Sequence, residues 1–358
     1  TCRHAGKYDN FVVKGDKAAN ERGVEMNRPG HGLLGRRIFS AGLVSQLVLV
    51  LIFAAGCSLE KMALKKAAGM LTAPSAGTVF TGDDDPELVA GALPFAIKFY
   101  ESLLASLPEH AGLRLRTGSL YIMYASAFIQ APADMTPATE VESRQVLLAR
   151  AKKLYLRGRD MLLAGLERKN PRLREQLRAR QFKKALSPYG LKDIDFLYWA
   201  AAGWVAAYSI DPFDMSIGLT LPEAAALMNR VLELEPNYSD GAVHNFYILY
   251  YGSLPQGLGG DENKAREHFR QAEKLCGDSD TSYLLSLATT VAVKNQNRQE
   301  FISLLKKVME FNPDQAPQNR LVNILNKRKA AWLLEHVDDF FLPPEDGQED
   351  STGGERKK

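Results

Sequence analysis

Cysteine is nearly absent from this chain, which has three among 358 residues: Cys2, Cys57 and Cys276. The first two lie in or next to an N-terminal segment that we interpret separately below, so Cys276 has no partner for an internal disulfide. A lone cysteine at a predicted helix end is typical of a partly buried filler rather than of a nucleophile. The composition therefore excludes a disulfide-stapled fold, and a hydrophobic core must stabilise the protein.

Motifs for metal, phosphate and nucleophilic chemistry are also missing. The six histidines have no second His or Cys at metal-ligand spacing, HExxH is absent, and neither GxSxG nor a P-loop occurs. The glycines of GLGG, residues 257–260, precede a predicted helix without a leading strand, which favours a turn with Asp261 as N-cap over a phosphate site. We therefore predict no catalytic residue, no metal and no cofactor, and hence no enzyme.

An excess of charge of either sign is lacking too. The formal net charge is +3, but eight of the 45 basic residues and only four of the 42 acidic ones lie in the first 56 positions, so the rest is nearly neutral. We expect no nucleic-acid partner. A local exception is RKNPRLREQLRARQFKK, residues 168–184, whose only acid is Glu175. This stretch fits a solvated helix face, or docking on an acidic partner or on lipid headgroups.

One long hydrophobic run is present, over residues 38–56. Its nineteen residues approach the length of a membrane span. Basic residues including Arg36 and Arg37 precede it, and the small residues Ala54, Ala55 and Gly56 lead into Cys57. This profile is typical of a cleaved signal peptide whose first mature residue is cysteine. An uncleaved anchor with an incidental cysteine is the alternative.

The chain divides accordingly. Residues 1–25 carry charges of both signs and no apolar period, so we exclude them from the fold and take Met26 as the start. The predicted parts that follow are a signal peptide (26–56), a tether and linker (57–85), a helical domain (86–342) and a polar, disordered tail (343–358).

Apolar residues recur with helical period over nearly all of the predicted domain, and strand alternation is absent. The fold class we predict is therefore all-α. Helices are expected at 86–107, 111–130, 138–168, 171–186, 191–210, 221–235, 239–253, 261–276, 280–295, 298–311 and 317–339.

An internal repeat is visible among these helices. A small or apolar residue is followed four positions later by a bulky one, then three later by an apolar one, then by a helix stop. These steps place three side chains on one helix face, and the copies that begin at Ala224, Ala265 and Phe301 approach the 34-residue period of a tetratricopeptide (TPR) array. The four copies are Ala96/Tyr100/Leu103/Pro108, Ala224/Met228/Val231/Pro236, Ala265/Phe269/Ala272/Gly277 and Phe301/Leu305/Val308/Pro313.

Aromatic residues are concentrated on three predicted helices, in LYIMYASAF (120–128), DFLYWAAAGWVAAY (195–208) and HNFYILYY (244–251). A wholly apolar helix is usually a central one, so these rings fit a core. The alternative is a groove or tunnel for an apolar ligand, because large residues beside small ones leave space. The candidate ligand-binding residues are Tyr198, Trp199, Trp204, Phe246, Tyr247 and Tyr250.

Several of these features together resemble one known family. They are the signal ending at Cys57, DDDPELVAGALPFAIKFYESLLASLPEHAGL (83–113), YWAAAGWVAAYS (198–209) and the repeats that stop at Pro236 and Pro313. They are similar to the T component of TPR-associated tripartite ATP-independent periplasmic (TRAP) transporters. The resemblance covers residues 57–342, although Ala54 stands where lipoprotein signals usually carry leucine.

The resemblance implies an all-helical fold of about four irregular TPR-like hairpins plus additional helices. It implies a periplasm-facing lipoprotein that is lipidated at Cys57, anchored to a membrane and assembled as a homotrimer. It also implies binding to the solute-binding P component of a TRAP transporter, and an apolar pore or cleft for a hydrophobic small molecule. The alternative function is a TPR-like scaffold lipoprotein in envelope assembly with no small ligand.

Overall fold

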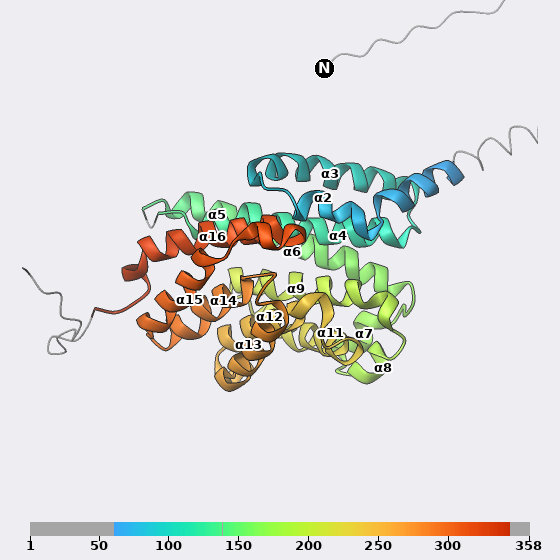
Figure 1. The fold of residues 1–358 in the computed structure, drawn as a ribbon. Coiled ribbons are helices and arrows are strands. Elements are labelled where there is room, and N and C mark those ends of the chain that lie inside the picture. The colour runs from blue at the N-terminus through green and yellow to red at the C-terminus, as the bar shows by residue number, and fades with distance from the viewer. Residues whose placement is uncertain (1–60, 138, 344–358) are drawn as a thin grey trace, which may run out of the picture. The chain divides into compact units, whose positions relative to one another are not determined.

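The structure is a computed structural model that describes residues 61–137 and 139–343, where it contains helices and no strand (Figure 1). The all-α prediction is confirmed. Cys57, the predicted signal peptide and residues 344–358 lie outside the described part. The helices are α2 (Thr78–Thr81), α3 (Pro86–Ser106), α4 (Ala111–Ala125), α5 (Ala131–Asp134), α6 (Val141–Glu167), α7 (Leu173–Arg178), α8 (Phe182–Leu186), α9 (Ile194–Ile210), α10 (Met215–Gly218), α11 (Leu221–Leu234), α12 (Tyr238–Ser253), α13 (Glu262–Cys276), α14 (Ser282–Leu287), α15 (Arg298–Glu310) and α16 (Arg320–Glu335).

Helix ends follow local sequence signals. α3 begins with Pro86 behind Asp85, whose carboxylate accepts a hydrogen bond from the Leu88 amide at 3.0 Å. The helices that carry the repeat stop just before Pro108, Pro236 and Pro313, and α13 stops just before a glycine. Proline and glycine thus end these helices where the repeat predicts.

The repeat positions face the protein interior. All three apolar positions of the copies in α11 and α15 are buried, as are Ala265 and Ala272 in α13. Phe269 is half-buried, and of the copy in α3 Tyr100 is buried whereas Ala96 and Leu103 are half-buried. The shared face is therefore a packing face, while the assignment of these helices to TPR-type hairpins stays a prediction.

The single helix predicted over 171–186 is wrong. The structure has two short helices there, α7 and α8, separated by Arg180 with φ at 57°. A left-handed residue ends an α-helix, and helical periodicity alone does not reveal such a break. Two other predicted helices also change form, since residues 126–130 and 288–292 wind into π-helical turns.

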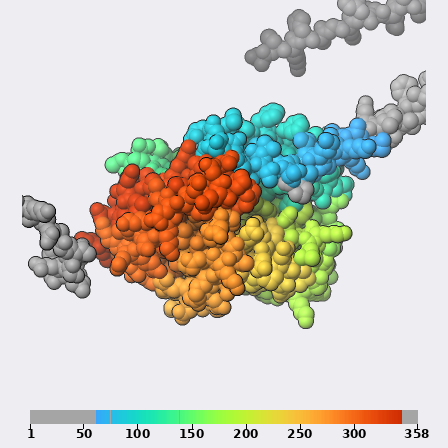
Figure 2. Space-filling model, in the orientation of Figure 1, coloured from blue at the N-terminus to red at the C-terminus, as the bar shows by residue number. Residues whose placement is uncertain are grey.

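Most helices pack against the helices that precede and follow them in the chain, and the last helix packs against the first ones. α3 packs on α4, α4 on α6, α6 on α9 and α9 on α11, after which α12 pairs with α13 and α14 lies beside α15. The last helix, α16, contacts both α2 and α3. Figures 1 and 2 show this C-terminal segment, in red, beside the blue and cyan N-terminal helices. Arg328 pairs with Glu87, and Lys329 lies 3.1 Å from Asp134, so side chains from both ends of the domain meet there.

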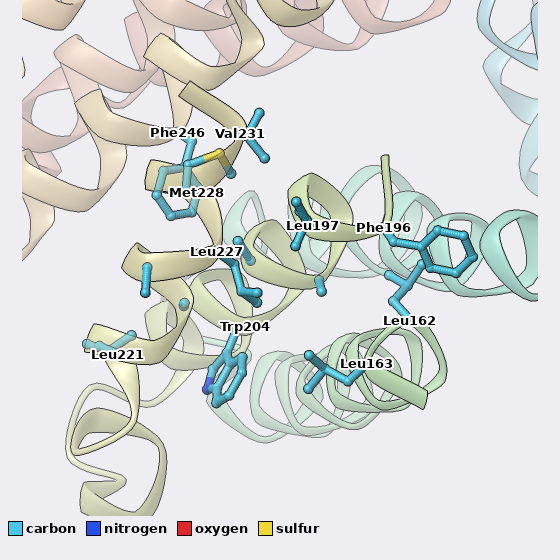
Figure 3. Packing of buried hydrophobic residues seen from close by; sticks show 14 of the residues in the cluster. Leu162, Leu163, Phe196, Leu197, Trp204, Leu221, Leu227, Met228, Val231 and Phe246 are labelled. Carbon is cyan, nitrogen blue, oxygen red and sulfur yellow. The ribbon is translucent and has the colours of Figure 1, made fainter. Parts of the chain in front are cut away.

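Three glycines let the central helices approach closely. An ideal Cβ on Gly158 of α6 would lie 2.7 Å from the Gly118 carbonyl oxygen of α4, and one on Gly203 of α9 would lie 2.6 Å from Ile122. Beside this crossing lies the largest buried cluster, which includes Leu162 and Leu163 of α6 together with Leu197 and Trp204 of α9 (Figure 3). α6 and α9 thus form the centre on which α4 and α11 are placed.

The outer side of α3 is an apolar stripe. Leu88, Phe95 and Phe99 fall on one helix face and are exposed, Phe95 by 74%, and the two phenylalanine rings stack with centroids 6.0 Å apart. Among the described helices, α3 is long and apolar enough to cross a membrane by length and composition. Its opposite face, with Leu93 and Ile97, is buried in a cluster with α4.

Candidate functional site

The six candidate ligand-binding residues all lie in or against the largest hydrophobic cluster, where their rings form three groups. Phe246, Tyr247 and Tyr250 form one buried group on α12. Trp204 is buried in the central cluster of α9, and Figure 3 shows it well apart from Phe246. Tyr198 and Trp199, at the beginning of α9, are half-buried. The structure therefore brings all six residues to one cluster, although their rings do not make a single stack.

The group on α12 is a dense ring stack. Phe246 stacks on Tyr250 at 5.9 Å, and Tyr247 stacks on Tyr251 at 5.6 Å, as expected for residues four apart on a helix. His268 of α13 stacks on Tyr247 at 4.6 Å. The Tyr247 hydroxyl donates to Asn229 of α11. Rings packed on one another in this way join α11, α12 and α13, which is the role of a core.

Trp204 is also fixed from two sides. Its indole Nε1 donates to the Thr220 hydroxyl at 2.9 Å, and the Arg159 guanidinium lies 4.8 Å from its ring centroid. A buried tryptophan whose N–H is satisfied, under a stacked cation, is well held in one orientation. Trp204 thereby fixes the chain that enters α11.

The half-buried aromatics form a different arrangement, which we call the aromatic ledge: Tyr198, Trp199 and Tyr238. Tyr198 meets Trp199 edge-on at 5.5 Å and Tyr238 at 5.0 Å, and the Tyr238 hydroxyl donates to Asp195 at 2.6 Å. Burial, with the nearby Asp280 carboxyl, raises the pKa of Tyr198. Both phenols therefore stay protonated at neutral pH, and the ledge offers apolar faces with polar tips.

Tyr238 was not predicted, although an aromatic residue directly after the helix stop Glu235-Pro236 was a possible signal. The backbone that follows Tyr238 is unusual, since Ser239, Asp240 and Gly241 all have positive φ values, of 47°, 50° and 99°. A Cβ on Gly241 would also lie 3.2 Å from the Leu275 Cβ. Consecutive left-handed residues are costly and hold only where packing fixes them. Here the turn places Tyr238 against α9.

Two histidines meet behind the ring stack. The Nδ1 atoms of His244 and His268 are 2.8 Å apart, so one ring donates and the other accepts. Burial lowers the pKa of His268 to about 4, and the neighbouring His244 and Lys264 add to this effect. Burial lowers the pKa of His244 as well. The pair is therefore neutral at physiological pH.

This pair predicts a pH dependence of stability. The pKa of His268 is lower in the folded than in the unfolded chain. The contribution of the neutral His268 ring to the free energy of unfolding is therefore complete above pH 6.5 and is lost as the pH falls toward 4. We expect the free energy of unfolding in urea to be about 1–2 kcal/mol lower at pH 5 than at pH 7.5. In His268→Gln the free energy of unfolding should differ less between pH 5 and pH 7.5. If the difference were the same as in the wild type, other titratable groups would be its cause.

A cavity of about 280 Å³ lies elsewhere, between α13, α14 and α15. Phe269, Leu287 and Leu304 give it apolar walls, and Arg266, held by Glu300 at 2.6 Å, is at its edge. None of the six predicted residues lines it. This volume is at the lower end for a small-molecule pocket.

Cys276 has the structural role expected from the sequence. It is buried, its Sγ donates to the Ala272 carbonyl at 2.9 Å, and burial raises its pKa to about 12. A thiol in this state is a poor nucleophile. Within residues 61–137 and 139–343, no group of three His, Cys, Asp or Glu side chains could hold a metal ion.

Comparison with known proteins agrees with the fold. The family model described as TRAP transporter T-component matches residues 82–341, which is most of the described domain. An uncharacterized protein of Treponema pallidum (strain Nichols) is 34% identical over 306 residues, which cover 81% of this chain and 95% of that protein. The chain therefore belongs to the TRAP transporter T-component family, a family of transporter accessory proteins associated with the periplasm and membrane.

Proposed function

We propose that this protein is a periplasm-facing lipoprotein that binds the solute-binding P component of a TRAP transporter. The family match over residues 82–341 carries the proposal, because it covers the described domain almost from end to end. The domain supports a binding role rather than a chemical one, since stacked helices present broad surfaces to protein partners. The signal-like run before Cys57 supports the membrane anchor.

A homotrimer is the assembly we propose. The apolar stripe on α3 supports self-association, because a second copy can cover the exposed side chains of Leu88, Phe95 and Phe99. The variant Phe95→Glu should then sediment as a smaller species than the wild type, with an unchanged circular dichroism spectrum. A trimer that persists in this variant would place the interface elsewhere.

A hydrophobic small molecule is the ligand we propose for the aromatic ledge. Tyr198 and Trp199 support it, because half-buried rings can still contact a ligand, whereas Trp204 and Tyr247 are already covered by protein. Native mass spectrometry should detect an apolar molecule retained by the wild type and lost from Trp199→Ala. The dense packing of the other candidates favours the alternative function, a scaffold lipoprotein without a ligand. Wild-type protein that carries no small molecule in native mass spectrometry would support this alternative.

Sedimentation velocity with the purified P component of the same transporter tests the main proposal. The full chain in mild detergent should form a heavier complex with it, and an unrelated periplasmic solute-binding protein should not shift the sedimentation coefficient. Absence of the complex at concentrations of about 10–100 μM, where weak specific interfaces are populated, would contradict the proposed function.

A further inference from the structure

The basic stretch 168–184 separates into two halves in the structure. The first half is neutralised within the protein. Arg168 pairs with a glutamate, Lys169 lies 2.7 Å from Asp193, Arg172 lies 2.8 Å from Glu175, and Arg174 bridges two acids of α6. These four cations therefore serve the fold.

The second half remains available. Arg178, Arg180, Lys183 and Lys184 are all exposed, and none makes a salt bridge with a residue that the structure describes. They lie at the end of α7, in the turn after it and at the beginning of α8. Four exposed cations within seven residues outnumber the nearby carboxyls of Glu175 and Glu223, so this edge carries an excess of positive charge.

Arg180 stands where a glycine is usual. Its amide donates to the Leu177 carbonyl and the Gln181 amide donates to the Gln176 carbonyl, both at 2.9 Å, which is the Schellman arrangement at the end of α7. The residue at this position takes positive φ, here 57°, at some cost for any residue with a side chain. The fold does not need arginine at this position.

An exposed apolar loop adjoins this basic edge. Arg180 Nη2 donates to the Leu219 carbonyl at 3.4 Å, which places the turn beside residues 211–219. On this loop Phe213 is 92% exposed and Leu219 is 64% exposed. Phe213 lies six residues before Leu219, and α10 spans four of the residues between them, so the two Cα atoms are within about 15 Å of each other.

The loop is held in place. Lys152 Nζ lies 2.8 Å from the carboxylates of both Asp211 and Asp214, and Asp214 also accepts the Ser216 amide at 2.9 Å. At the far end, Thr220 accepts the indole N–H of Trp204. An exposed phenylalanine on a fixed loop loses little conformational entropy when it enters a pocket.

We propose that Arg178, Arg180, Lys183, Lys184, Phe213 and Leu219, the 178–219 surface, dock onto an acidic face of the P component that has an apolar pocket for Phe213. The inference rests on the proposed function and names the surface that performs it. A protein partner is favoured over lipid headgroups because one exposed aromatic residue on a fixed loop, next to a basic edge, is the pattern of a protein interface. A membrane would instead need a broad apolar face.

The variants are chosen to leave the fold intact. Arg178 and Arg180 lie near the buried carboxyl of Glu223, so neither is reversed in charge. The charge variant is Lys183→Glu/Lys184→Glu, the anchor variant is Phe213→Ser, and the third is Arg180→Gly. Lys306→Glu and Leu258→Ser, both at exposed positions on other elements, are the matched controls.

The affinity of the full chain for the P component is measured by biolayer interferometry at two salt concentrations. We expect Kd to rise about tenfold or more in the charge and anchor variants, and the salt dependence to weaken in the charge variant. The controls should bind like the wild type. Arg180→Gly should weaken binding about threefold without lowering the thermal midpoint, because glycine relieves the positive φ.

The outcomes separate this inference from the proposed function. If the wild type binds the P component and all three variants bind equally well, the 178–219 surface is the wrong one while the proposed function stands. If the wild type does not bind, both fall. If the same variants instead abolish binding of the chain to phosphatidylglycerol vesicles and not to the P component, the surface faces lipid and the inference is overturned.

Discussion

Replacing Gly158 with valine is expected to lower the free energy of unfolding by about 3 kcal/mol, a large part of the stability of an ordinary domain. The new Cβ would lie 2.7 Å from the Gly118 carbonyl oxygen and 2.8 Å from Ile122 Cγ1. The first neighbour is backbone, so no rotamer change relieves the clash, and α4 and α6 must move apart. Urea unfolding followed by circular dichroism at 222 nm measures the loss.

Gly91 is the matched control for this change. It lies in the middle of α3, and a Cβ on it would have no neighbour within 4 Å. Gly91→Ala should therefore stabilise the protein by about 0.5–1 kcal/mol, because alanine favours the helix. If Gly158→Val were as stable as Gly91→Ala, the close crossing of α4 and α6 would not exist in solution.

Replacing Cys57 with serine is expected to move the protein from the membrane fraction to the soluble fraction. The proposed anchor is acyl chains on this thiol, and each buried CH₂ contributes about 0.8 kcal/mol, so the loss of two or three chains removes the attachment. Cell fractionation measures the distribution, and intact mass spectrometry of the membrane-bound wild type should show the added lipid.

Cys276→Ser is the control, because that thiol is buried in the domain and cannot be reached for lipidation. It should stay in the membrane fraction. Retention of Cys57→Ser in the membrane, with the hydrophobic run 38–56 still present in the intact mass, would support the uncleaved anchor instead.

The positions of helices could be predicted from local pattern because the signals are themselves local. Apolar residues at helical spacing, proline after α3, α11 and α15, and the cap at Asp85 act within one or two turns of the chain. The repeat placed Met228 and Leu305 on the shared face of their helices, since a three-four spacing defines a face whatever lies opposite, and the structure shows that both are buried.

The site could be predicted only in part. Helical spacing placed Phe246 and Tyr250 on one face, and they do stack. It could not show that His268 of the next helix stacks on Tyr247 and Tyr251. It also could not separate Trp204, whose N–H is bound by Thr220, from Trp199, which is half-buried. Both tryptophans lie on the same helix, and their surroundings come from different neighbours.

By itself, then, the sequence determined an all-helical chain, the ends of most helices, and which face of each repeat helix is buried. The tertiary structure decided which aromatics are covered, that Arg180 breaks a predicted helix, and that the Arg180 side chain reaches the Leu219 carbonyl of the loop that carries Phe213. The physical reason is the separation along the chain of the residues that each interaction joins. Helix propensity and capping depend on residues a turn apart, whereas burial and partnership depend on how helices distant in sequence cross.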